Sequence, residues 1–283
     1  MAEDFPIDIA QIVALFLESI FFGIHIVTFG LCIHVLLFSR HTRPNGGRRY
    51  RVLNPFFLVS SLLFVIAAFD EGLSLRHVLD AFIWYKGAGG AKEELADISY
   101  WVNVMKTVTY AAQASIADSI LIYRCYVVYS RNWMIAAGLL VLWAACFILG
   151  AFICYIEFTM HTNAFLNSSQ LSPFITSVLL LILSLNLIAT TLIVFKIWKI
   201  QSVTARYVSS YGQGRQENTT LRRAMRIIIE SGAIYSVSLI TFFVVYIAGN
   251  NAQYGVSDCV VQIVGIAFNL MIVRLDQGRT IEN

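Results

Sequence analysis

Seven long apolar stretches divide this chain, and each of them is long enough to cross a lipid bilayer as a helix. About 20 predominantly apolar residues are needed to cross roughly 30 Å of hydrocarbon. Because lipid offers no hydrogen bonds to the main chain, segments of this kind are expected to be helical. The sequence therefore predicts an all-α polytopic membrane protein, a seven-transmembrane-helix bundle that forms a single domain over residues 1–283. The predicted spans are 12–38, 55–80, 100–129, 133–157, 173–198, 225–248 and 256–273.

Composition supports this class of protein and argues against others. Hydrophobic residues make up 58% of the chain and charged residues only 13%, which lies far outside the range of soluble globular proteins. The formal net charge of +3 does not indicate a nucleic-acid partner, because in a membrane protein the distribution of basic residues matters more than their sum. The lipid bilayer is the expected partner, and the plasma membrane is the expected location.

The basic residues predict how the bundle is oriented. Sixteen of the twenty Lys and Arg residues fall on one side of this topology, in residues 40–51, at Arg124 and Arg131, in residues 196–226 and in the tail after residue 273. Cytoplasmic loops carry an excess of Lys and Arg, so we expect the N-terminus outside and the C-terminus in the cytoplasm. The sequon at Asn167 then lies outside and predicts a glycan, whereas the sequon at Asn218 lies in a cytoplasmic loop.

The third stretch carries ionisable residues at membrane depth, where they are costly and usually functional. Lys106, Tyr110 and Gln113 share one helix face in its predicted outer half. With polar residues of spans one, two and seven, they would anchor a small-molecule ligand in an outer cavity. The alternative is a structural ion pair of Lys106 with an acidic residue, since a buried charge without a partner costs several kcal/mol. The predicted ligand-binding residues are Lys106, Tyr110, Gln113, Glu18, His25, Asp70, Glu71 and Gln262, of which Glu18, Asp70 and Glu71 are the candidate ion-pair partners.

A second polar group lies in the predicted inner half, on spans three, six and seven. Charged pairs between spans three and six would break when the bundle rearranges, as in a switch. The alternative is structural, because Arg226 and Glu230 are four residues apart on one helix and Arg124 can extend to the interface. Asp118 has no Lys or Arg three or four residues away, so its partner must be another helix, the main chain or water. The predicted helix-coupling residues are Asp118, Arg124, Arg226, Glu230 and Asn269.

No catalytic or cofactor motif is present in the sequence. It lacks a P-loop, a dinucleotide fingerprint, a Gly-x-Ser-x-Gly elbow and Cys or His residues at zinc-ligand spacing. We therefore expect no enzymatic activity, no metal and no cofactor. Cys154 and Cys259 both lie near the predicted outer boundary, where a disulfide between them could form.

Four segments carry a resemblance to known membrane proteins: Asp118–Val128, Arg131–Trp133, Ile229–Tyr235 and Gly265–Arg274. On these segments the chain resembles, from about Ala14 to Arg274, an uncharacterised family of seven-helix integral membrane proteins of mushroom-forming (basidiomycete) fungi. The resemblance implies the fold and the membrane location, because the family has no agreed ligand or reaction. The architecture is also similar to that of G-protein-coupled receptors, although Asp-Arg-Tyr at the end of span three and Asn-Pro-x-x-Tyr in span seven are absent.

These features favour a receptor-like protein that senses a small, partly apolar ligand through an outer cavity. It would signal through its basic cytoplasmic loops to a cytoplasmic signalling protein. The main alternative is a small-solute transporter or channel that uses the polar face of span three, and the second is a structural partner in a membrane complex. A cavity closed beneath Gln113 would favour the receptor, a wet path past Asp118 would favour transport, and a packed interior would favour the structural role.

Overall fold

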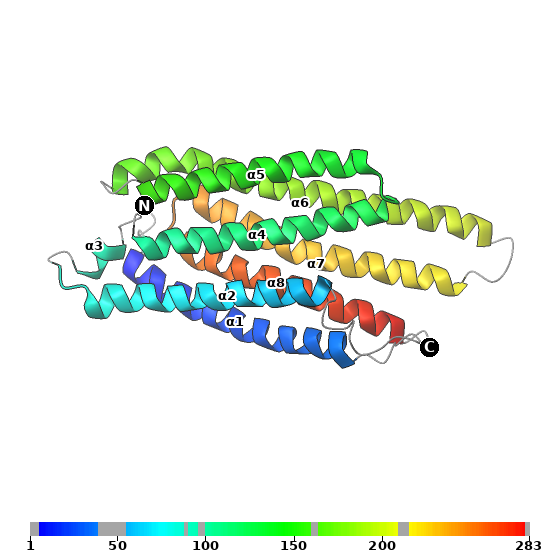
Figure 1. The fold of residues 1–283 in the computed structure, drawn as a ribbon, viewed down its shortest axis with the longest axis horizontal. Helices are drawn as coiled ribbons and strands as arrows, with labels where there is room; N and C mark the ends of the chain where they lie inside the picture. The colour runs from blue at the N-terminus through cyan, green and yellow to red at the C-terminus, as the bar shows by residue number, and fades with distance from the viewer. Residues whose placement is uncertain are drawn as a thin grey trace.

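Seven long helices form a single bundle in the computed structural model (Figure 1). The structure describes residues 6–38, 55–87, 90–95, 100–159, 164–208 and 215–280. It describes the main chain alone for 93, 164–171, 201, 203–208, 215–228, 231 and 275–280. No strand occurs in these described ranges, so the all-α prediction is confirmed.

The long helices coincide with the predicted apolar stretches, and most of them extend a few residues further. A π-helical turn, η2 (Asp80–Trp84), continues α2, and a short helix, α3 (Ala91–Leu95), follows it. The long helices are α1 (Ile7–Phe38), α2 (Pro55–Leu79), α4 (Trp101–Val128), α5 (Trp133–Thr159), α6 (Ala164–Val208), α7 (Arg215–Ile247) and α8 (Gln253–Thr280).

Two helix boundaries differ from the sequence prediction. Pro173 was expected to open the fifth span, but it lies inside α6, which begins at Ala164. An interior proline costs one main-chain hydrogen bond and clashes with the carbonyl four residues before it, but it can kink a helix without ending it. Likewise, α7 begins at Arg215 rather than near Met225, because polar residues extend the helix beyond its apolar part.

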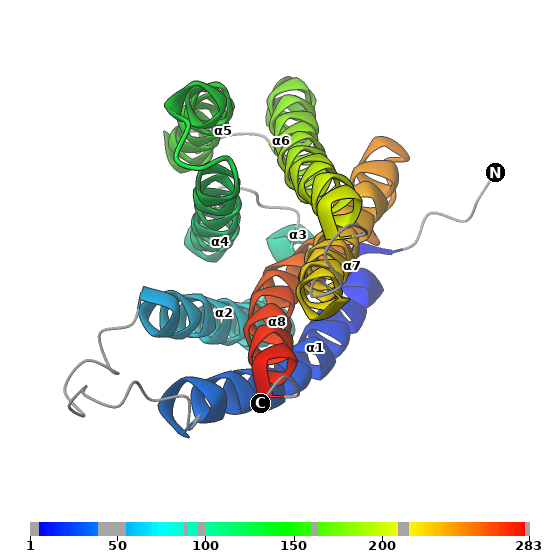
Figure 2. The same cartoon turned by 90° about the vertical axis from the view of Figure 1, so that its right-hand side faces the viewer.

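The last helix lies in the middle of the bundle. It packs against α1, α2, α4 and α7 (Figure 2). By contrast, α5 makes substantial contacts with only two helices of the described chain, α4 and α6. The first helix begins at one end of the bundle and α8 finishes at the opposite end (Figure 1). We call these the N-terminal end and the C-terminal end. Asp118 lies between them, about 25 Å along α4 from Trp101.

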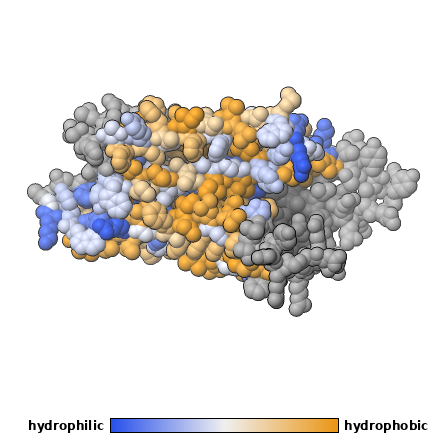
Figure 3. All heavy atoms as spheres, viewed as in Figure 1, coloured by the Kyte–Doolittle hydropathy of each residue, from blue (hydrophilic) through white to orange (hydrophobic). Residues whose placement is uncertain are grey.

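The outer surface of the bundle is strongly apolar, as a membrane protein requires. Five helical segments in the described ranges are long and apolar enough to span a membrane: α1, α2 with η2, α5, α6 and α8. In α1 and in α5, only 17% of the apolar 18-residue segment is buried inside the bundle, whereas in α8 the buried share is 78%. Figure 3 shows a broad hydrophobic band with hydrophilic residues toward its two ends. This pattern is that of an integral membrane protein.

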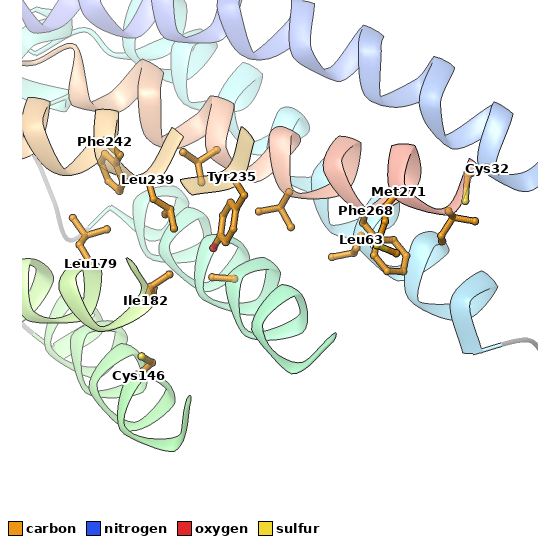
Figure 4. Packing of buried hydrophobic residues seen from close by; sticks show 14 of the residues in the cluster. Cys32, Leu63, Cys146, Leu179, Ile182, Tyr235, Leu239, Phe242, Phe268 and Met271 are labelled. Atoms are coloured by element: carbon orange, nitrogen blue, oxygen red, sulfur yellow. The ribbon is translucent and has the colours of Figure 1, made fainter. Parts of the chain in front are cut away.

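Buried apolar side chains pack between the helices at two levels. Toward the N-terminal end, Phe242 and Leu239 of α7 face Leu179 and Ile182 of α6 (Figure 4). Toward the C-terminal end, a second set brings together α1, α2 and α8. Its members are Cys32, Leu63, Phe268 and Met271. Polar side chains that lie between these helices are therefore held in an apolar surrounding, where each needs a partner.

Candidate functional site

A cavity of about 650 Å³ occupies the interior toward the N-terminal end, and every long helix contributes to its wall. Leu95, Glu157 and Gln253 line the cavity nearest the N-terminal end of the bundle, which we call its upper limit. Asp118 lines it nearest the C-terminal end, which we call its lower limit. The rise from Asn103 to Asp118 along α4 is about 22 Å, so the cavity follows more than half of that helix. Its volume is in the range that holds a small organic ligand.

One wall of the cavity carries an ion pair. Lys106 Nζ of α4 lies 2.8 Å from Asp258 Oδ2 of α8, and both side chains are largely buried. Asp70 of α2 also lines this wall and accepts a hydrogen bond from the Thr109 hydroxyl. The sequence predicted Lys106 and Asp70 but paired Lys106 with residues of α1 or α2. The sequence prediction missed Asp258 as the partner. Its position could have indicated it, because Asp258 shares one helix face with the polar residues Gln262 and Asn269, and all three are buried.

Glu18 of α1 lies directly behind this wall and is fully buried. Carboxylate oxygens of Glu18, Asp70 and Asp258 all lie within 4.8 Å of one another, so three helices bring three acidic groups to one point. The Ser74 hydroxyl lies close enough to interact with Glu18. Neither Ser74 Oγ nor either Glu18 oxygen makes a hydrogen bond of ordinary geometry. We call Glu18, Asp70 and Asp258 the carboxylate cluster.

Another part of the cavity wall is aromatic and aliphatic. The Tyr110 ring meets Phe242 edge-on at 5.9 Å between ring centroids, and Phe242 meets Tyr246 in the same way at 6.3 Å. All three residues line the cavity. The cavity therefore offers both charged groups and aromatic rings, which suits a ligand that has a polar group and an apolar body.

Asp118 forms the floor of the cavity and also lines a second, smaller cavity of about 70 Å³ beneath it. Asp118 interacts electrostatically with the hydroxyls of Tyr110 and Tyr235. Its Oδ1 atom and both of these hydroxyl oxygens have no hydrogen-bond partner among the described residues. Arg124 lines the lower cavity, with its guanidinium 5.8 Å from the centre of the Phe268 ring. The two cavities thus meet at a buried acid.

Five of the eight predicted ligand-binding residues do not line the cavity: Glu18, which lies behind its wall, and four others. Gln113 is fully buried and donates to the main-chain oxygens of Leu63 and Val261 at 3.4 and 3.1 Å. His25 Nδ1 lies 3.1 Å from Gln262 Oε1, so these two side chains bind each other between α1 and α8. Glu71 accepts a hydrogen bond from Ser19 at 2.6 Å. None of these four residues lines the cavity in the described part of the chain.

The predicted helix-coupling residues fall into separate places. Glu230 of α7 forms an ion pair with Arg274 of α8, a partner that the sequence did not indicate. Asn269 accepts a hydrogen bond of 2.6 Å from Ser60 and joins α8 to α2. The side chain of Arg226 lies outside the described residues, as do those of Asn167 and Asn218.

The disulfide considered from the sequence is not formed. Cys154 and Cys259 are both free thiols in the structure. Cys154 lines the large cavity from α5, whereas Cys259 is buried on the central helix α8.

Comparisons with known proteins add no relative to this picture. A scan against protein-family models found no match, and a search of curated proteins found none either. The resemblance to the fungal seven-helix family therefore stays a prediction.

Proposed function

We propose that this protein is a receptor-like, seven-helix membrane protein that binds a small ligand in the large cavity. The observation that carries the proposal is the cavity itself, with its volume of about 650 Å³ and its charged and aromatic walls. All seven long helices would span the membrane, including α4 and α7, whose charged residues reduce their mean hydropathy. A structural role without a ligand is less favoured, because such a role gives no reason for an interior cavity of this size.

The proposed orientation places the N-terminal end of the bundle outside the cytoplasm, and glycosylation tests it. In eukaryotic cells the protein should carry a glycan at Asn167 and none at Asn218. Treatment with an N-glycosidase should then shift the electrophoretic mobility of the wild type and of Asn218→Gln, but leave Asn167→Gln unchanged. A glycan that is retained in Asn167→Gln and removed by Asn218→Gln would reverse the orientation.

The large cavity does not close beneath Gln113, where a receptor cavity was expected to close, but continues to Asp118. The small size of the second cavity beneath Asp118 is what supports a receptor over a transporter. The upper cavity can hold a ligand of many atoms, whereas about 70 Å³ beneath Asp118 is room for roughly two waters at about 30 Å³ each. A ligand would therefore enter from the N-terminal end and stop at Asp118. A shift of α4 against α7 and α8 at this level would carry the signal to the basic loops at the C-terminal end.

Ligand binding can be tested by filling the cavity from α5. Gly150 lines the cavity, and a Cβ added there would make only an ordinary contact of 3.9 Å with Ala111. Gly150→Leu should therefore fold but occupy part of the ligand volume. Compounds that raise the melting temperature of the purified wild type, found by screening small amphipathic molecules, should bind this variant at least about tenfold more weakly.

The matched control is Gly138→Leu on the same helix. Gly138 does not line the cavity, and a Cβ there would meet no atom within 4 Å. This variant should bind each compound as the wild type does. Equal affinity in Gly150→Leu and the wild type would show that the compounds bind elsewhere, and a screen without any stabilising compound would count against the receptor proposal.

Transport is the second candidate function, and a specific observation favours it. Asp118 lines both cavities, so movement of one side chain could connect them. The test is uptake of a bound compound into sealed proteoliposomes that contain the purified protein. Concentration-dependent uptake would replace the receptor proposal with a transporter, whereas binding without uptake would support the receptor.

A further inference from the structure

The carboxylate cluster has an unbalanced charge. Glu18, Asp70 and Asp258 are 0%, 1% and 5% exposed, and they lie on α1, α2 and α8. Lys106 is the one basic side chain that acts on all three of them among the described residues. If all four groups are ionised, the cluster has two negative charges in excess in the interior of a membrane protein. Such an excess is costly in a low-dielectric interior and favours the binding of a cation.

The geometry of the cluster matches a coordination shell. Oxygens on opposite sides of a Ca²⁺ ion are about 4.6–5.2 Å apart, twice the usual Ca–O distance of about 2.3–2.6 Å. The cluster oxygens lie within 4.8 Å of one another, so a single ion can touch all three carboxylates with small side-chain adjustments. Asp258 accepts from Lys106 through Oδ2 and, at 3.3 Å, from the Ser257 hydroxyl through Oδ1. A carboxylate oxygen has two lone pairs, so each oxygen can still contact an ion.

Two further observations point to a ligand at this place. Ser74 is 4% exposed, and its hydroxyl oxygen is directed at Glu18 without a hydrogen bond of ordinary geometry. The two Glu18 oxygens and Asp70 Oδ2 are buried and make no hydrogen bond of ordinary geometry in the described part of the chain, although the Glu18 and Asp70 carboxyl groups lie close enough to interact with each other. Buried polar atoms are nearly always paired, and an ion among these oxygens would satisfy them together.

We propose that Glu18, Asp70, Asp258 and the Ser74 hydroxyl form a binding site for a hard metal cation of the Ca²⁺ or Na⁺ class. Its donors are all oxygens, which such cations prefer over softer transition metals. A divalent ion would balance three carboxylates and one ammonium, and a sodium ion would do so together with one proton. The ion reaches the site from the large cavity, because Asp70 and Asp258 line its wall. The inference does not depend on the ligand proposed for that cavity.

The first test is thermal unfolding of the full-length protein in detergent. The protein is treated with a chelator, transferred to choline chloride, and titrated with CaCl2, MgCl2 or NaCl at constant ionic strength and pH. Binding to the folded state should give a saturable rise in melting temperature of about 5 °C or more at 100 times the dissociation constant. Isothermal titration should show one site per chain. A melting temperature that depends on pH but on none of these cations would mean that protons alone neutralise the cluster, and would overturn the proposal.

The second test compares two buried glutamates that both become glutamine. Glu18→Gln removes a ligand and should abolish most of the cation-dependent shift. Glu157→Gln is the matched control, because Glu157 is 9% exposed and lines the same cavity without acting on the cluster. It should keep the full shift. An equal loss in both variants would overturn the assignment of the ion to this cluster.

A third variant, Lys106→Met, should change the cation affinity in the opposite direction, and its result does not depend on whether Glu18→Gln folds. Lys106→Met removes a positive charge that repels the bound ion, so the cation should bind at least about tenfold more tightly than in the wild type. A purely structural cluster would show no cation affinity in either protein. Weaker binding in Lys106→Met would contradict the proposed arrangement. Whether or not a cation binds, the Gly150→Leu variant still tests ligand binding in the large cavity separately.

Discussion

Lys106→Met is expected to lower the free energy of unfolding by about 3–5 kcal/mol in a buffer without metal ions. The substitution keeps a long side chain but removes the ammonium that lies 2.8 Å from Asp258. Three carboxylates then remain in a buried volume without the cation that acts on all of them. The cost comes mainly from these uncompensated charges, and reversible unfolding in mixed detergent micelles measures it directly.

The control for this prediction is an ion pair of similar length at the edge of the bundle. Arg76 Nε lies 2.9 Å from Asp80 Oδ2, but the Arg76 side chain is 52% exposed. Arg76→Met should therefore cost no more than about 1 kcal/mol. Asp258→Asn introduced into Lys106→Met should recover part of the loss, because it removes one of the unpaired charges. Similar losses in Lys106→Met and Arg76→Met would show that burial does not determine the strength of the Lys106 pair.

The all-helical fold could be predicted from the sequence because the bilayer fixes the length and polarity of each segment. Residues 12–38 and 133–157, for example, lie within α1 and α5. The ends of α6 and α7 were less predictable. Polar residues upstream of Pro173 and around Arg215 continue those helices beyond their apolar parts, where hydropathy no longer marks the boundary.

The candidate site was predictable in part. Lys106 stood out because an ammonium at membrane depth needs a reason, but its partner depends on which helices are neighbours. The sequence offered Glu18, Asp70 and Glu71 on α1 and α2, whereas α8 occupies the middle of the bundle and presents Asp258 instead. The rotation of α4 about its axis explains why Gln113, a predicted ligand-binding residue, does not line the cavity. Gln113 shares a face with Lys106, yet it reaches the main chain of α2 and α8 rather than the cavity.

Asp118 was identified from the sequence as a residue whose partner must be another helix, the main chain or water. The structure surrounds it with two tyrosine hydroxyls and two cavities, which no spacing rule along one helix could indicate. The cluster of Glu18, Asp70 and Asp258 was equally hidden, because its members come from three helices that are distant in sequence. Their positions along the chain did not predict this cluster, because only packing brings the three helices together.

Gly265→Ala is expected to destabilise the bundle by about 1–3 kcal/mol, although alanine is the better helix former. Gly265 is buried on α8, and a Cβ at this position would overlap the imidazole of His25 on α1. The His25 ring is fully buried and bound to Gln262, so it cannot move aside without losing that hydrogen bond. One methyl group would therefore separate α1 from the central helix, and the melting temperature should fall.

Gly30→Ala provides the matched control, because a Cβ on Gly30 would meet no atom within 4 Å. It should leave stability unchanged or raise it by up to about 1 kcal/mol. The double variant His25→Ala with Gly265→Ala tests the cause, since the added methyl group then has no ring to displace. If the clash between Gly265 and His25 is what destabilises α1, the double variant should be more stable than the sum of the two single losses predicts, with a coupling of about 0.5–3 kcal/mol. If the two single losses of stability simply add in the double variant, a clash with His25 is not the cause of the loss in Gly265→Ala.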